Sequence, residues 1–416
     1  MSELRITGGH RLSGEVYIHG AKNSVLPILA ATVLVPGVSV IRNCPDLSDV
    51  RSSLAILEHL GCKTKRQGDT VTVDASQMTG CKVPDKLMRE MRSSVIFLGA
   101  ILARTGCARL NLPGGCELGP RPIDLHLAAM SALGARVECG ADGLRCTAGS
   151  LTGTEVNLIL PSVGATENLM LAACGAKGTT VIQNAAREPE IVDLQNFLNA
   201  MGGRVRGAGS SVIVVEGGCS LHGGAHTVMG DRIVAATYLS AAAAAGGDVA
   251  VRGVDWRHVS TVTAVLRQAG CHVCSEGDAV RLICDKPLKA VRPIHTAPYP
   301  GFPTDAQAPV MAALAAARGS TLFVEHIFES RYRHVDELIR MGANIRVEGR
   351  VAVVTGVNRL HGSCVQATDL RGGAALVVAA LGAEGETVLT QLHHIDRGYE
   401  RLEADLCALG AQVVRI

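Results

Sequence analysis

The clearest pattern in this chain is a step from an amphipathic segment, through a glycine, into a segment in which apolar and polar residues alternate. The step occurs six times, at Leu60-Gly61, Leu133-Gly134, Met201-Gly202, Ala269-Gly270, Met341-Gly342 and Leu409-Gly410. Each glycine suits the end of a helix, and the alternation after it predicts a strand. Because successive glycines are 68 to 73 residues apart, the chain is predicted to consist of six tandem supersecondary modules.

A second helix, rich in small apolar residues, is predicted ahead of these steps in each module. The six apolar stretches are residues 25–34, 95–102, 169–173, 233–245, 310–317 and 374–381. A helix that is apolar on every side belongs inside the fold rather than on its surface. Each module is therefore predicted to contain an inner helix, a strand, a loop, an outer helix and two strands, which makes the fold class α/β.

The two ends of the chain resemble each other. Residues 6–14 and 354–362 share Thr-Gly, Arg-Leu and a final glycine, and the last module stops after one strand, so we expect the N-terminal strands to complete it. This predicts two domains of three modules each: residues 21–229, and residues 1–20 together with 230–416. Two connections between the domains, near residues 20 and 230, are typical of a hinged clamp with its active site in the cleft.

Composition excludes several function classes. Aromatic residues make up only 3% of the chain and the formal net charge is +2, which argues against a base-stacking platform and against general attraction to nucleic acid or acidic membranes. The 14 cysteines accompany a polar N-terminus without a signal-peptide pattern, so we expect free thiols in a reducing compartment. The longest apolar run, residues 233–246, is too short to span a bilayer. A soluble, cytoplasmic protein is expected.

Polar and charged residues immediately precede the inner helices. They are Lys22-Asn23, Arg92-Ser93, Thr166-Glu167-Asn168, Asp231-Arg232, Thr304-Asp305 and Asp369-Leu-Arg371. Ser93, Thr166 and Asp231 fit the ordinary role of helix caps. Lysine and arginine do not, because a cation opposes the helix dipole, whereas an anionic ligand would remove that conflict. The pattern predicts an anion site lined by these helix starts.

The segment 112–125 places one thiol, Cys116, among glycines and prolines. Such a loop can move as a unit, and nearby guanidinium groups favour a reactive thiolate. A Gly/Pro turn with an incidental small residue is the alternative. Cys62 and Cys271 instead occupy the small-residue position after the repeat glycine, which indicates structural roles. Cys271 and Cys274 have a zinc-like spacing, but no second pair accompanies them, so no metal site is expected.

Taken together, several motifs are similar to those of the UDP-N-acetylglucosamine enolpyruvyl transferase (1-carboxyvinyltransferase) family. They are Lys22-Asn23, LPGGCELGPRPIDLH at 112–126, PSVGATEN at 161–168, NAAREPEIVDL at 184–194, PGFPTD at 300–305 and Asp396-Arg397. The resemblance runs along nearly the whole chain. It implies two inside-out α/β barrel domains of three modules each. It also implies transfer of the enolpyruvyl group of phosphoenolpyruvate to the 3-hydroxyl of UDP-N-acetylglucosamine through a tetrahedral ketal. This reaction releases phosphate and begins peptidoglycan synthesis.

The resemblance also implies roles for individual residues. Asp305 would be the base for the sugar hydroxyl, Cys116 the proton donor and the nucleophile that fosfomycin alkylates, and Asp369 a partner in proton handling. Asn23 would orient the sugar hydroxyl. The expected contacts to phosphoenolpyruvate are Lys22, Asn23, Arg92, Arg121, Arg331, Arg371 and Arg397. No cofactor is implied.

The expected contacts to the UDP-sugar form a second set. They are Asn23, Arg92, Arg121, Pro122, Ile123, Asp124, Leu125, Ser162, Val163, Gly164, Asp305, Ile327 and Glu329. One departure from the family concerns position 160, where some members have a lysine and this chain has Leu160. A basic contact to the diphosphate is therefore in doubt.

Two other functions remain open from the sequence. One is a different enolpyruvyl transferase on the same scaffold, such as the shikimate-pathway enzyme. The other is a repeat protein that binds an anion without chemistry. The second alternative does not explain why an acid, a base and a thiol all occur at equivalent ends of the modules.

Overall fold

The computed structural model describes residues 2–111, 123–140 and 143–416 of the chain. These residues form two compact units. One contains residues 2–19 and 230–416, and the other contains residues of the span 20–229. The predicted site residues Cys116, Arg121 and Pro122 lie outside the described residues. Among the described helices, none has the length and apolar character that a membrane span requires.

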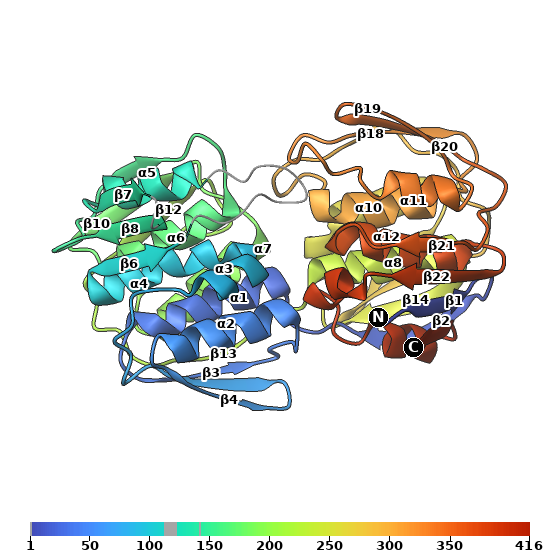
Figure 1. Ribbon diagram of the computed structural model, residues 1–416. Coiled ribbons are helices and arrows are strands. Elements are labelled where there is room, and N and C mark those ends of the chain that lie inside the picture. The colour runs from blue at the N-terminus through green and yellow to red at the C-terminus, as the bar shows by residue number, and fades with distance from the viewer. Residues whose placement is uncertain (1, 112–122, 141–142) are drawn as a thin grey trace. The chain divides into compact units, whose positions relative to one another are not determined.

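The unit within residues 20–229 has three small sheets among its described residues (Figure 1). The first has the strand order β13 (Ala225–Thr227), β3 (Val38–Arg42), β5 (Thr70–Asp74), β4 (Lys63–Gln67). The second has the order β6 (Cys107–Leu110), β8 (Gly143–Thr147), β7 (Arg136–Gly140). The third has the order β11 (Arg204–Arg206), β12 (Val212–Glu216), β10 (Thr179–Gln183), β9 (Glu155–Asn157).

The helices of this unit divide into inner and outer sets. The inner helices, which pack against one another, are α1 (Lys22–Ala31), α4 (Phe97–Thr105) and α6 (Val163–Cys174). The outer helices are α2 (Ser48–His59), α5 (Asp124–Ala132) and α7 (Pro189–Ala200). Short helical segments are η1 (Thr32–Leu34), α3 (Asp85–Glu90) and η2 (Arg92–Ile96).

The second unit also has three sheets. Their strand orders are β15 (His272–Glu276), β16 (Ala279–Cys284), β14 (Gly247–Arg252), β2 (Leu12–Tyr17); β17 (Ile294–His295), β18 (Ser320–Val324), β20 (Val351–Thr355), β19 (Asn344–Glu348); and β21 (Cys364–Gln366), β22 (Glu386–Thr390), β1 (Leu4–Thr7), β23 (Gln412–Arg415). In the last sheet Ile6 lies opposite Thr387 on one side and Val413 on the other. The start of the chain therefore supplies a central strand between two strands from its end.

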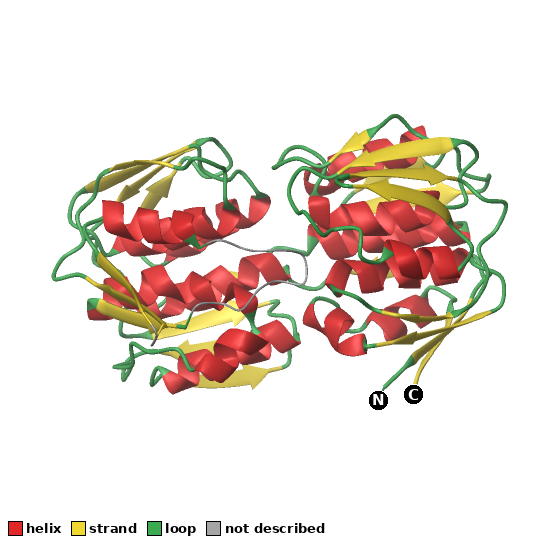
Figure 2. Ribbon diagram, turned by 45° about the horizontal axis from the view of Figure 1, so that its top comes forward, coloured by secondary structure: helices red, strands yellow, loops and turns green. Residues whose placement is uncertain are grey.

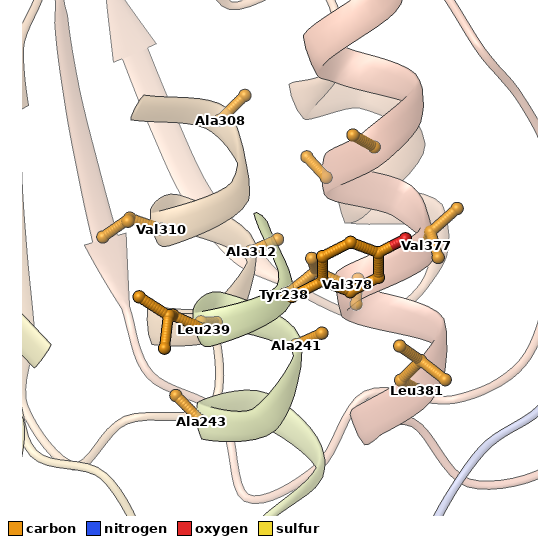
Figure 3. Close-up of a cluster of buried hydrophobic side chains, with 14 of the residues drawn as sticks. Tyr238, Leu239, Ala241, Ala243, Ala308, Val310, Ala312, Val377, Val378 and Leu381 are labelled. Atoms are coloured by element: carbon orange, nitrogen blue, oxygen red, sulfur yellow. The ribbon is translucent and has the colours of Figure 1, made fainter. Parts of the chain in front are cut away.

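Three inner helices form the core of this unit: α8 (Arg232–Ala245), α10 (Thr304–Leu314) and α12 (Leu370–Gly382). Their facing side chains are mostly small, as Ala241, Ala312 and Val378 illustrate (Figure 3). The inner helices lie inside each unit, and the strands lie farther out (Figure 2), because the inner helices are apolar around their whole circumference. The remaining helical segments are η3 (Trp256–Val259), α9 (Ser260–Gln268), α11 (Val335–Arg340), η4 (Leu392–Arg397) and α13 (Leu402–Ala408).

The six repeat glycines have the same backbone conformation. Gly61, Gly134, Gly202, Gly270, Gly342 and Gly410 have φ angles between 90° and 110°, a region that glycine enters without steric cost. Each follows the end of an outer helix, as the sequence predicts. The mixed α/β fold class predicted from the repeat pattern is confirmed.

Two of the predicted helix caps are wrong. Asp231 does cap α8, accepting hydrogen bonds from the backbone of Ile233 and Val234. Thr166, however, lies one turn inside α6, whose cap is Ser162. Ser93 lies inside η2 rather than at its cap. An apolar run marks only the buried part of a helix, and the helix can begin several residues earlier. Polar residues just before the run then lie inside the first turns of the helix.

Candidate active site

The carboxylate of Asp305 is held by two arginines. Asp305 is the second residue of α10, and its Oδ1 accepts a hydrogen bond from Nη2 of Arg331 at 2.7 Å while Oδ2 accepts one from Nη2 of Arg371 at 3.2 Å. The arginine side chains are only 2% and 3% exposed, whereas that of Asp305 is 27% exposed. The Asp305 carboxylate is therefore accessible to solvent, and its hydrogen bonds to two buried arginines fix its orientation.

Arg371 has a second anchor that the sequence did not reveal. Its Nη1 donates to the hydroxyl of Tyr399 at 3.4 Å, and that hydroxyl lies 2.8 Å from the hydroxyl of Thr237 in α8. Burial opposes the charge on Arg371, but the nearby Asp305 carboxylate and the Tyr399 hydroxyl leave its pKa above the usual value. Tyr399 follows the expected site residue Arg397 by two positions, which is the only sequence signal that could have suggested it.

Arg331 and the start of α10 are tied to the segment after β18. Arg331 donates from Nε and Nη2 to the carbonyl oxygen of Thr304, at 3.2 and 3.0 Å. The Thr304 hydroxyl donates to Glu325, whose other carboxylate oxygen accepts the backbone N–H of Ile327 at 2.7 Å. Glu325 is fully buried and was not predicted from the sequence, although a glutamate directly after an apolar strand is a recognisable signal.

The residues expected to border the sugar lie in this same segment. Ile327 is 37% exposed. Glu329 is exposed and accepts a hydrogen bond from Arg350 at 3.2 Å. Glu325 therefore positions the backbone that carries Ile327 relative to the start of α10, which carries Asp305.

Asp369 caps α12. Its Oδ1 accepts hydrogen bonds from the backbone N–H groups of Arg371 and Gly372, both at 3.0 Å. The buried imidazole of His334 adjoins Asp369 and Arg331, and burial lowers the pKa of His334 to about 4. At neutral pH the buried imidazole of His334, next to Asp369 and Arg331, is therefore uncharged. Arg397 is the last residue of η4 and is half-buried.

The expected residues of the other unit begin with Lys22, the first residue of α1. Its Nζ lies 3.3 Å from Oδ2 of Asp49, and the two side chains are 11% and 2% exposed. Because one carboxylate already neutralises this buried ammonium, Lys22 has a fixed direction before any ligand binds. Asn23 is half-buried beside it, and Arg92 is the first residue of η2.

Two helix starts in this unit carry the expected nucleotide contacts. Ile123, Asp124 and Leu125 lie at the start of α5, whereas Ser162, Val163 and Gly164 lie at the start of α6. The two helices pack against each other. The tertiary structure therefore brings these two groups of residues together. Ile159 and Leu160, on the segment just before α6, are 83% and 62% exposed.

The other thiols named from the sequence have structural surroundings. Cys62 and Cys271 are buried, and burial raises the pKa of Cys62 to about 11. A hydrogen bond to Cys284, together with burial, raises the pKa of Cys271 above the usual value. The thiol of Cys274 contacts Glu276. Both buried thiols stay protonated at neutral pH, as expected of packing residues rather than nucleophiles.

The fold and its charged helix starts define a class of protein: a two-unit α/β protein built from repeated modules, with charged residues at the starts of its inner helices. The chain belongs to the EPSP synthase family, whose model, described as EPSP synthase (3-phosphoshikimate 1-carboxyvinyltransferase), matches residues 6–406. The family resemblance inferred from the motifs is thereby confirmed.

Individual relatives are similar over the full length. The chain is 52% identical over 416 residues to UDP-N-acetylglucosamine 1-carboxyvinyltransferase 2 of Caldanaerobacter subterraneus, covering all of both chains. It is 48% identical over 425 residues to UDP-N-acetylglucosamine 1-carboxyvinyltransferase of Zymomonas mobilis, again covering all of both.

Solved structures agree in fold. The enolpyruvyl transferase NikO from Streptomyces tendae superposes with a TM-score of 0.90 at 29% identity, covering 100% of this chain and 98% of that one. EPSP synthase from Acinetobacter baumannii superposes with a TM-score of 0.76 at 18% identity, covering 100% of both chains. The second likeness concerns the fold alone.

Proposed function

We propose that this protein transfers the enolpyruvyl group of phosphoenolpyruvate to the 3-hydroxyl of UDP-N-acetylglucosamine, with release of phosphate, as the first committed step of peptidoglycan synthesis. The observation that carries the proposal is that relatives with this transferase name are 52% and 48% identical in sequence to this chain over its full length. The function expected from the motifs is the same.

Asp305 is the proposed base. Adding a sugar hydroxyl across the enol ether requires a group that accepts the hydroxyl proton. Asp305 combines partial exposure with two arginine partners, so one carboxylate is both accessible to a substrate and held in one direction. Arg331 and Arg371 act through Asp305 and also contribute positive charge for a substrate that carries phosphate and carboxylate groups.

The remaining roles are those expected from the motifs. Cys116 donates the proton to the methylene carbon, and Asp369 takes part in proton handling. Lys22, Arg92, Arg121 and Arg397 hold the phosphate and carboxylate of phosphoenolpyruvate, and Asn23 orients the sugar hydroxyl. The direction of Lys22, set by Asp49, supports its part. We also propose that each unit is an inside-out α/β barrel.

The nucleotide contacts belong to the same proposal. The starts of α5 and α6, with residues 121–125 and 162–164, hold the uridine diphosphate, while Ile327 and Glu329 border the sugar. The packing of α5 against α6 supports this pairing, since both helix starts then reach one ligand. No cofactor is needed, because the step is an addition followed by an elimination.

The test is a phosphate-release assay on the full chain with phosphoenolpyruvate and one of two co-substrates. We expect release with UDP-N-acetylglucosamine and none with shikimate 3-phosphate. Release with shikimate 3-phosphate alone would assign the activity named by the family model instead. Release with neither, from a protein that still binds UDP-N-acetylglucosamine, would favour a binding protein without this chemistry.

A further inference from the structure

Asp193, in α7, is a buried carboxylate with three hydrogen-bond partners. Its Oδ2 accepts the hydroxyl of Ser24 at 2.5 Å and the backbone N–H of Met229 at 3.2 Å, and its Oδ1 lies 2.8 Å from Nε2 of His226. Asp193 is 8% exposed and Ser24 is fully buried, so water does not compete strongly for these contacts. Asp193 belongs to the motif at 184–194, and the proposed reaction assigns it no role.

The start of α1 depends on these contacts because it has no side-chain cap. The residue at the cap position is Ala21, whose methyl group cannot accept a hydrogen bond. The backbone N–H of Ala21 donates instead to the carbonyl oxygen of Met229 at 2.7 Å. The first turn of α1 also contains no acidic residue, and Asp193, which contacts Ser24 in that turn, supplies negative charge near the positive end of the helix dipole.

The contacts at this helix start form a closed cycle within one unit. Oδ2 of Asp193 accepts from both Ser24 and Met229. The carbonyl oxygen of Met229 accepts from Ala21, and the carbonyl oxygen of Ala21 accepts the N–H of Ser24 at 3.1 Å. The cycle joins α7, the segment after β13 and the first turn of α1. Because the turn is held at both Ala21 and Ser24, it cannot rotate about the helix axis without breaking a buried hydrogen bond.

His226, in β13, holds the other oxygen of the carboxylate. With Oδ1 of Asp193 as the acceptor, Nε2 of His226 is the donor. The imidazole also lies against the ring of Phe197, one turn after Asp193 in α7, with the two ring centroids 5.7 Å apart. The carboxylate of Asp193 is therefore fixed in direction from α7 and from β13 before it meets α1.

We propose that Asp193 is a positioning residue for Lys22, acting through Ser24 on the first turn of α1. The inference rests on the proposed function, in which Lys22 contacts phosphoenolpyruvate. Lys22 is two residues before Ser24, and its ammonium lies 3.3 Å from the buried carboxylate of Asp49 in α2. A rotation of the first turn would carry the ammonium away from Asp49. A misplacement of about 1 Å can cost roughly 100-fold in rate.

Replacing Ser24 by Ala is the mildest test. It removes one hydroxyl from a buried position and leaves Lys22 and Asp193 in the chain. We expect KM for phosphoenolpyruvate to rise roughly 10-fold, while kcat and KM for UDP-N-acetylglucosamine stay within about 3-fold of the parent. Asp193→Asn replaces one acceptor oxygen by a nitrogen that can only donate, and it should raise KM for phosphoenolpyruvate at least as much.

Each variant has a matched control in the other unit. Ser240→Ala also removes a buried serine hydroxyl from an inner helix, one that donates to the carbonyl oxygen of Ala236 in α8. Asp405→Asn changes a carboxylate of α13 that accepts a hydrogen bond from Tyr238 of the inner helix α8 at 2.9 Å. Both controls should lower the thermal unfolding midpoint and leave KM for phosphoenolpyruvate unchanged. An unchanged KM in Ser24→Ala would overturn the proposal, as would an equal rise in Ser240→Ala.

The direction of Lys22 can also be measured without the reaction. Acetic anhydride labels exposed amines, and mass spectrometry of the peptides gives the rate for each lysine. The side chain of Lys22 is 11% exposed and that of Lys86 is 86% exposed, so Lys86 serves as the internal reference. We expect labelling of Lys22 relative to Lys86 to become several-fold faster in Ser24→Ala and to stay unchanged in Ser240→Ala.

The labelling result separates this inference from the proposed function. Unchanged labelling of Lys22 in Ser24→Ala would overturn the positioning role, whatever the kinetics show. Faster labelling in that variant, combined with failure of the parent in the transfer assay, would reject the proposed reaction while leaving the hold of Asp193 on α1 in place.

Discussion

Oδ2 of Asp305 lies 3.2 Å from Nη2 of Arg371, although the two residues are 66 positions apart in the chain. Asp305 is near the start of α10 and Arg371 near the start of α12. The contact exists because these two inner helices pack against each other with their starts at the same end. It brings the proposed base together with one of its positioning cations.

Replacing Asp305 by Asn tests the proposed base. The amide has nearly the same shape but cannot accept the hydroxyl proton, so we expect turnover to fall by roughly 100-fold or more, while the affinity for phosphoenolpyruvate stays within about 3-fold. Steady-state kinetics and equilibrium binding measure the two effects. Asp285→Asn, at an exposed carboxylate paired with Arg11, is the matched control. Retained turnover in Asp305→Asn would remove Asp305 from the base role.

Replacing Tyr399 by Phe tests whether the buried hydroxyl positions Arg371. The substitution removes the hydrogen bonds to Arg371 and Thr237. We expect a loss of about 1 kcal/mol in the free energy of unfolding and a fall of roughly 10-fold in kcat/KM for phosphoenolpyruvate, through misplacement of the cluster around Asp305.

Tyr238→Phe is the matched control for this prediction. It removes another buried tyrosine hydroxyl of the same unit, one that donates to Asp405 at 2.9 Å. It should destabilise the protein at least as much and leave kcat/KM unchanged. Equal kinetic losses in the two variants would mean that stability alone explains the effect.

The thiols should differ in reactivity. We expect Cys116→Ser to abolish turnover and labelling by fosfomycin, and Cys271→Ala to do neither, because the pKa of the buried Cys271 thiol is raised by its hydrogen bond to Cys284 and by burial. Cys62, with a pKa of about 11, should likewise escape labelling at pH 7. Peptide mass spectrometry after treatment identifies the labelled residue, and a label on Cys62 or Cys271 would contradict this assignment.

Acid should destabilise the protein through His126 and His334. Burial lowers the pKa of each from 6.5 to about 4, so the folded state favours the neutral ring. This stability is fully present above pH 6.5, falls as the unfolded chain binds protons below that pH, and is lost by about pH 4. At pH 5 each histidine should contribute a loss of about 2 kcal/mol.

Urea unfolding at pH 7 and pH 5 measures this loss. In His334→Gln the difference between the two pH values should shrink by about 2 kcal/mol, whatever the variant's absolute stability. His272→Gln, at an exposed strand position, should keep the full difference. A His334→Gln variant with the same pH dependence as the parent would show that this imidazole does not titrate as its burial requires.

The sequence could predict much of the local structure because each signal is short-range. Each signal, whether a repeat glycine, an apolar helix or an alternating strand, occupies a few neighbouring residues. Such local patterns largely determine the local secondary structure. The misplaced caps show the limit. A polar residue such as Thr166 lies inside α6 because tertiary partners satisfy it: its hydroxyl accepts the N–H of Ala186.

The candidate site was predicted in part. Lys22, Asp305, Arg371 and Asp369 could be named because the repeat puts them at equivalent helix starts. Glu325 and Tyr399 were missed, since each acts through a residue distant in sequence. Burial and hydrogen bonding, rather than residue type, set their roles.

By itself, then, the sequence determined the modules, their order and the residue types at each helix start, because a 3.6-residue or 2-residue period and a glycine are properties of a single segment. Only the tertiary structure decided that Asp305 lies between Arg331 and Arg371, and that Asn168 in α6 lies 2.8 Å from Nδ1 of His126 in α5. Such contacts form only when separate helices pack together. The packing decides which donor faces which acceptor.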